Sequence, residues 1–114
     1  YLFFRDYQNT KFILGIYIKD FEQNLIGSVY ADQDQIFESI IFKYFKDDSI
    51  KMIKYIDIYD DTTLNHLMVK DLIIDIDHLL QRASGKEYDV LLIIRHMCDD
   101  VLKEDHQYLI FDGD

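Results

Sequence analysis

Three aspartates lie close together near the middle of the chain, at Asp57, Asp60 and Asp61, and Thr62 and Thr63 follow them. Carboxylates at a strand end and in its turn can hold Mg²⁺ or Ca²⁺, because both ions prefer hard oxygen ligands. The spacing is not that of an EF-hand loop, and the turn contains no glycine. The same side chains could instead make turn and helix N-cap hydrogen bonds. A metal-dependent hydrolase is therefore kept only as an alternative.

A second group of aspartates, Asp71, Asp75 and Asp77, lies on the expected outer face of a long helix. Asp71 and Asp75 are i, i+4 neighbours of like charge, which destabilises an isolated helix. Aspartate is also a poor helix former, so stability alone does not account for this choice of residue. Short, rigid carboxylates suit recognition of Lys and Arg on another protein. The alternative is a solvated face that keeps the domain soluble.

Histidine and cysteine show no catalytic pattern. His66, His78, His96 and His106 lack the HExxH spacing or any other spacing typical of metal ligands. Cys98 is the one cysteine and falls on the expected apolar face of a helix, where a thiol behaves as a small hydrophobic group. We expect no catalytic residues, no metal and no cofactor.

Tyrosine is frequent, with nine residues in the chain. Tyrosine is favoured both in strands and at protein interfaces, where it offers a large contact area with few rotatable bonds. Tyr55 and Tyr59 flank Asp57 and are expected on the same strand face. We therefore take these two tyrosines as interface candidates, and Tyr59 as the expected anchor.

The charge of the chain is concentrated in its second half. Residues 1–46 contain five Lys/Arg and six Asp/Glu, whereas residues 47–114 contain seven and sixteen, and the net charge is −10. A charge of this sign disfavours direct binding to nucleic acid or to an anionic membrane surface. The apolar content of 49% is typical of a folded domain rather than of an acidic tail. We expect an acidic globular domain that meets a positively charged partner.

Length and segment composition predict one domain in the cytoplasm. A chain of 114 residues can bury a single core without disulfides. Its apolar runs are shorter than a membrane span, and no signal-peptide pattern opens it. The chain starts at Tyr1 rather than at Met, which leaves open a further segment before it.

The elements that must position these residues follow from hydrophobic periodicity. Residues 2–7 and 11–18 read as a hairpin, and residues 25–30 as a third strand in which Gly27 marks a bulge or a close backbone approach. Residues 33–46 read as a helix started by an Asp32/Gln35 capping box. Residues 50–59 read as a strand ending at the acidic turn. The order βββαβααβ predicts an α+β fold with a mainly antiparallel sheet of about five strands and three helices.

The last two helices and the last strand have the clearest patterns. An i, i+3, i+4, i+7 stripe runs from Val69 to Ala83 and places Lys70, Asp71, Asp75 and Asp77 on the opposite face. After a stop and restart at Ser84, the next helix has its expected inner face at Leu91, Ile94, Cys98, Val101 and Leu102. Such a short connection predicts antiparallel packing. Residues 107–111 read as a strand central in the sheet.

Two stretches carry a resemblance to known proteins: YIDIYDDTTLN at residues 55–65 and HQYLIFDGD at residues 106–114. In these stretches, and in its size and acidity, the chain resembles the immunity proteins of bacterial polymorphic toxin systems, including contact-dependent growth inhibition. The resemblance implies a cytosolic, non-enzymatic protein that binds one toxin tightly. It transfers no catalytic residues.

The leading hypothesis is an inhibitor that covers a basic toxin domain, such as a nuclease with a groove rich in Lys and Arg. The expected contacts are Asp57, Tyr59, Asp60, Asp61, Asp71, Asp75 and Asp77. Two alternatives remain, namely a metal-dependent hydrolase that uses Asp57, Asp60 and Asp61, and a homo-oligomeric adaptor.

Overall fold

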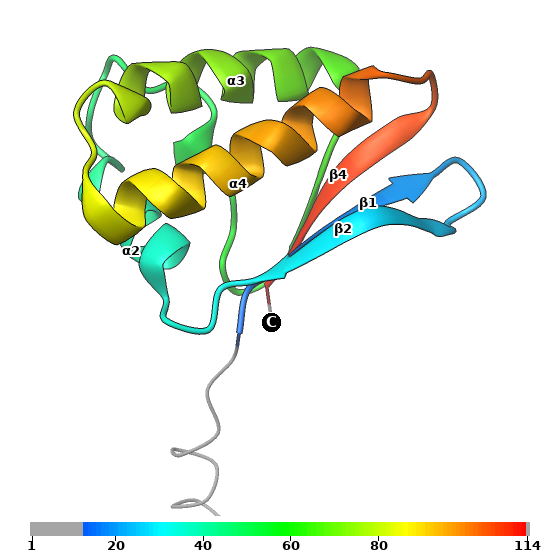
Figure 1. The fold of residues 1–114 in the computed structure, drawn as a ribbon, viewed down its shortest axis with the longest axis horizontal. Coiled ribbons are helices and arrows are strands. Elements are labelled where there is room, and N and C mark those ends of the chain that lie inside the picture. Colours follow the sequence, from blue (N-terminus) through cyan, green and yellow to red (C-terminus); the bar gives the residue numbers. More distant parts are fainter. Residues whose placement is uncertain (1–12, 114) are drawn as a thin grey trace, which may run out of the picture.

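Four strands, three helices and one short 3₁₀ helix follow one another in residues 13–113, which are the residues described by the computed structural model (Figure 1). The fold is α+β, as predicted. The elements are β1 (Gly15–Asp20), β2 (Leu25–Ala31), α2 (Ile36–Lys43), η1 (Ile53–Tyr55), β3 (Asp61–Leu64), α3 (His66–Leu80), α4 (Gly85–Leu102) and β4 (Gln107–Asp112).

The strands form one antiparallel sheet in the order β2-β1-β4-β3. The predicted central position of the last strand is confirmed, since β4 lies between β1 and β3. The expected strand at residues 2–7 lies outside the described residues. The other strand of the predicted hairpin, residues 11–18, corresponds only partly to β1, which begins at Gly15. One edge of β1 pairs with β2 and the other with β4.

The predicted bulge in β2 is also present. Between the paired residues Ile16 and Ile18 of β1 there is one residue, whereas three residues separate their partners Tyr30 and Ile26. Gly27 stands in this bulge with a φ of 67°, a left-handed conformation that glycine adopts without steric cost. The bulge interrupts the ladder along the edge of the sheet.

Helices α3 and α4 run antiparallel, side by side, over one face of the sheet (Figure 1). Helix α4 packs against β2, β1 and β4, and α3 packs against β4 and β3. The predicted inner face of α4 is confirmed, with Leu102 only partly buried. None of the helices in residues 13–113 combines the length and apolar character that a bilayer span needs.

The core lies between this helical layer and the sheet. Alternate residues of β1, Ile16 and Ile18, are buried, and so are Leu109 and Phe111 of β4. Phe111 stacks on Phe37 with ring centroids 5.7 Å apart, which ties β4 to α2. The helix predicted over 33–46 is shorter in the structure, and α2 ends at Lys43.

Asp32 starts this helix, although not as a full capping box. Its carboxylate accepts hydrogen bonds from the amides of Phe37 (3.0 Å) and Glu38 (2.9 Å), so it satisfies donors of the first turn. The second hydrogen bond of a capping box, from the Asp32 amide to the side chain of Gln35, is absent, because the Asp32 amide donates to the carbonyl of Leu14. Gln35 is the N-cap residue, with a φ of 57°.

The strand predicted over residues 50–59 is wrong. This segment forms turns and η1, and the strand that pairs with β4 is β3, which begins only at Asp61. The buried residues of the segment are Ile50, Ile53 and Ile56, a spacing of three rather than the spacing of two that a strand needs. The side chain that holds this segment in place is that of Asp75.

Candidate partner-binding surface

Asp75 is not on the outer face of α3, so its predicted role as a partner contact is wrong. It is 0% exposed, and its carboxylate accepts hydrogen bonds from the amides of Lys51 (2.8 Å), Met52 (2.5 Å) and Ile53 (3.0 Å). It stands three residues after Leu72 and four before Leu79, which are both buried, so it borders the apolar stripe. Asp75 therefore positions the 50–56 segment from within the core.

Asp57 and Asp60 are exposed and shape the turn in which they lie. The Asp57 carboxylate accepts a hydrogen bond from the Tyr59 amide at 2.8 Å, and the Asp60 carboxylate accepts one from the Asp61 amide at 2.8 Å. The Asp57 amide donates to Thr62 Oγ1 at 3.0 Å. These are the turn hydrogen bonds of the alternative interpretation. Among the residues with described positions, neither carboxylate forms an ion pair, so both face the solvent with their charge uncompensated.

Asp61 begins β3 and lies opposite Asp112 of β4 in the antiparallel register. The hydrogen bond between the two carboxyl groups raises the pKa of Asp61, and the charge of Asp112 adds to this effect. Tyr17 of β1 donates its hydroxyl to Asp112 at 3.2 Å. Desolvation raises the pKa of this phenol, and the Asp112 charge raises it further. The exposed end of the sheet is therefore strongly acidic.

Gly113 holds the acidic turn against the end of β4. Its amide donates to the carbonyl of Asp60 at 3.1 Å, and a Cβ at this position would lie 2.5 Å from the carbonyl oxygen of Ile58. No side chain fits in that space. The described parts of the two stretches that carry the resemblance, residues 55–65 and 106–113, thus come together in space through the pairing of β3 with β4.

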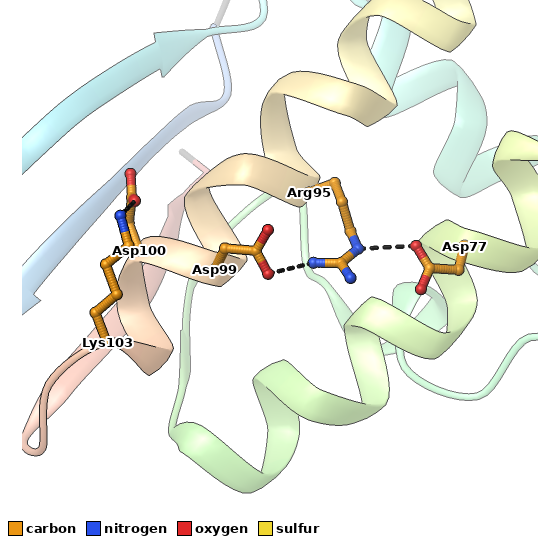
Figure 2. A network of polar contacts seen from close by, with 5 residues as sticks. All are labelled: Asp77, Arg95, Asp99, Asp100 and Lys103. Atoms are coloured by element: carbon orange, nitrogen blue, oxygen red, sulfur yellow. Dashed lines mark hydrogen bonds and ion pairs between the residues drawn. The ribbon is translucent and has the colours of Figure 1, made fainter.

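Asp71 and Asp77 are exposed on α3, as predicted, but Asp77 already has a partner within the domain. The guanidinium of Arg95 in α4 bridges Asp77 and Asp99, with Nε 2.8 Å from the Asp77 carboxylate (Figure 2). The hydrogen bond to Asp77 is the main cause that raises the pKa of Arg95. This bridge joins the two helices, so Asp77 has a structural role whatever else it contacts.

A groove lies between the end of α2 and the 54–59 segment. Its volume is about 350 Å³. Four aromatic side chains on its lining, between 54% and 75% exposed, are Phe42, Phe45, Tyr55 and Tyr59. We call it the aromatic groove. Asp57 also lines it, whereas Asp71 and Asp77 do not.

Only part of this groove was predictable from the sequence. Tyr55, Asp57 and Tyr59 were proposed from their position, whereas Phe42 and Phe45 were assigned no role outside the helix and core. They follow each other at i, i+3, a spacing equally typical of a buried stripe. Their exposure could have been predicted from their neighbours, because Ile40 and Ile41 already supply the buried face of this part of the helix.

The acidic turn offers little support for metal chemistry. Within residues 13–113, no three side chains of His, Cys, Asp or Glu converge closely enough to hold a metal ion. Asp57 and Asp60 instead bind amides of their own turn, and Asp61 interacts with Asp112. Nothing in this geometry favours the metal-dependent hydrolase.

The fold and surface together define an α+β domain with an acidic sheet end beside an exposed aromatic groove. Comparison of the chain with protein-family models, with curated proteins and with solved structures finds no match in any of the three. The surface of this chain is therefore the basis on which its function is inferred.

Proposed function

We propose that this protein is an immunity-type inhibitor, which binds and neutralises a cognate bacterial toxin domain in the cytoplasm. The observation that carries the proposal is the 57–61 turn. It presents Tyr59, 75% exposed, among the carboxylates of Asp57, Asp60 and Asp61. A large aromatic side chain that fills a pocket of the partner, with a polar rim around it, is a common arrangement at protein interfaces.

Charge supports a basic partner. The domain carries a net charge of −10, and a surface of this sign attracts a positively charged protein over distances of about one Debye length, roughly 8–10 Å. A nuclease presents such a surface, because its groove binds phosphates through Lys and Arg. In this proposal the carboxylates of the acidic turn take the place of the nucleic-acid backbone.

Rigidity supports tight binding. The turn is held by its own hydrogen bonds, by the Gly113 amide and by the pairing of β3 with β4. A preorganised surface loses little conformational entropy on association, which favours affinity. The resemblance to immunity proteins falls on the same two stretches of chain.

Binding to a toxin domain encoded next to this gene would test the proposal. We expect a stable complex by size-exclusion chromatography, and a surface-binding assay should show association that slows several-fold between low and physiological salt. The variant Y59A should weaken binding at least about tenfold, because it removes the anchor. The double variant D57N/D60N should mainly slow association.

The matched control is D105N, which removes one exposed carboxylate near the start of β4, at the other end of the sheet. It should leave binding unchanged. Absence of a complex with the neighbouring toxin would refute the immunity function. Salt-independent association would refute its electrostatic part alone.

A further inference from the structure

The aromatic groove continues into a second hollow beside it. This hollow has a volume of about 320 Å³ and is lined by Phe42, Lys43, Phe45 and Lys46. Phe42 and Phe45 also line the aromatic groove, so the two hollows adjoin along α2. We refer to the two hollows, which share the side chains of Phe42 and Phe45, together as the depression.

The charge around this depression is opposite to the charge of the whole molecule. Lys43 and Lys46 line its second hollow, and Lys54 lines the first. Lys43 lies 3.6 Å from Glu87, whereas within residues 13–113 neither Lys46 nor Lys54 forms an ion pair. The Lys54 ammonium instead lies 5.8 Å from the ring centroid of Tyr55.

Asp57 is the one acidic residue among those that line the two hollows. Asp57 lines the first hollow, and its carboxylate accepts a hydrogen bond from the Tyr59 amide. One carboxylate oxygen of Asp47 accepts a hydrogen bond from the Ser49 hydroxyl, and the other lies 3.7 Å from the guanidinium of Arg82. Neither Asp47 nor Asp48 lines either hollow. The second hollow is therefore lined by two lysines and no acid, whereas the first is lined by one lysine, Lys54, and one aspartate, Asp57.

We propose that this depression binds an apolar segment of a partner protein that carries carboxylates, which lie against Lys46 and Lys54. Apolar side chains of the segment would fill the space between Phe42, Phe45 and Tyr55. The inference rests on the proposed function only in taking the ligand to be part of a protein. It adds a second contact, of opposite charge, to the one at the acidic turn.

Labelled synthetic peptides test this directly by fluorescence anisotropy. The probe is a 12-residue peptide of Leu, Phe and Glu, compared with the same peptide carrying Lys in place of Glu. The overall charge of −10 predicts that the Lys peptide binds better. The local charge of the depression predicts that the Glu peptide binds better, by about tenfold at low salt.

Two variants and a control make the result specific. K46E/K54E should remove or reverse the preference for the Glu peptide, while K70E, which changes an exposed lysine on α3, should leave it unchanged. F45S should weaken the binding of the Glu peptide at least about tenfold. All four substituted positions are at least partly exposed, and thermal melts would verify folding.

Equal binding of both peptides, tighter binding of the Lys peptide, or an unchanged preference in K46E/K54E would overturn the inference. Self-association that is lost in K46E/K54E by sedimentation would also overturn it, since a second copy would then be the occupant. The assay contains no toxin. A toxin complex without peptide preference therefore refutes this inference alone, and peptide preference without a toxin complex refutes the proposed function alone.

Discussion

The carboxylate of Asp75 in α3 accepts a hydrogen bond of 3.0 Å from the amide of Ile53, twenty-two residues earlier in the chain. Two further amides, of Lys51 and Met52, donate to the same carboxylate. Without this acceptor the three donors would be left near or within the core with no partner. The bond thus connects a helix to the segment that carries the aromatic groove.

The variant D75A should destabilise the domain by about 3 kcal/mol, because unsatisfied buried donors retain their desolvation cost. Urea denaturation measures this change. D71A is the matched control, since Asp71 is an exposed aspartate four residues away on the same helix, and it should change stability by less than about 0.5 kcal/mol. Equal effects of the two variants would contradict the structural role of Asp75.

The close approach of Gly113 to Ile58 predicts that G113A destabilises the domain by about 2 kcal/mol, since the added methyl group overlaps backbone atoms. It should also weaken toxin binding by displacing the acidic turn. G15A is a control in a neighbouring strand, where the nearest atom to an added Cβ is 4.0 Å away. If G113A behaves like G15A in urea denaturation, the contact is not as described.

The pair of Asp61 and Asp112 predicts a specific pH dependence. The pKa of Asp61 is raised above 3.8, so in the acidic window between that value and its folded pKa the native state binds more protons than the unfolded state. This pair therefore lowers stability as pH rises through that window. D61N removes the effect, and its stability relative to the parent should increase from about pH 3 to pH 7. Urea midpoints across this range measure it, and a difference that stays constant with pH would contradict it.

Burial raises the pKa of the Cys98 thiol to about 12, from a usual value of 9.0. Because the thiolate is the reactive form, the folded protein should resist thiol reagents at about pH 8. Unfolding in guanidinium chloride should then release one reactive thiol per chain, since the chain has one cysteine. Rapid labelling of the native protein would show that α4 is less firmly packed than described.

Local periodicity was sufficient for much of the fold. The stripe from Val69 to Ala83 and the inner face of α4 predicted two long helices, and both pack against the sheet by those faces. The consecutive apolar residues Leu109, Ile110 and Phe111 predicted a central strand, and β4 is paired on both sides. These patterns are reliable because each repeats over several turns or falls on both faces of a strand.

The 50–59 segment shows where local patterns were not sufficient. Its many Ile and Tyr residues favour a strand by propensity, yet its amides bind the carboxylate of a residue far along the chain. Propensity cannot anticipate such a partner, because a tertiary hydrogen bond to a buried charge outweighs it. Because of the same contact, Asp75 is buried and does not lie on the surface where it was predicted.

By itself the sequence determined the fold class, the helical faces, the acidic charge and the candidacy of Asp57 and Tyr59. Only the tertiary structure decided which aspartates remain available to a partner, since Asp75 is buried and Asp77 is bound to Arg95. It also placed Phe42 and Phe45 beside Tyr55 and Tyr59. The physical reason is that burial and proximity depend on contacts between segments distant in sequence, whereas periodicity and charge are properties of the local chain.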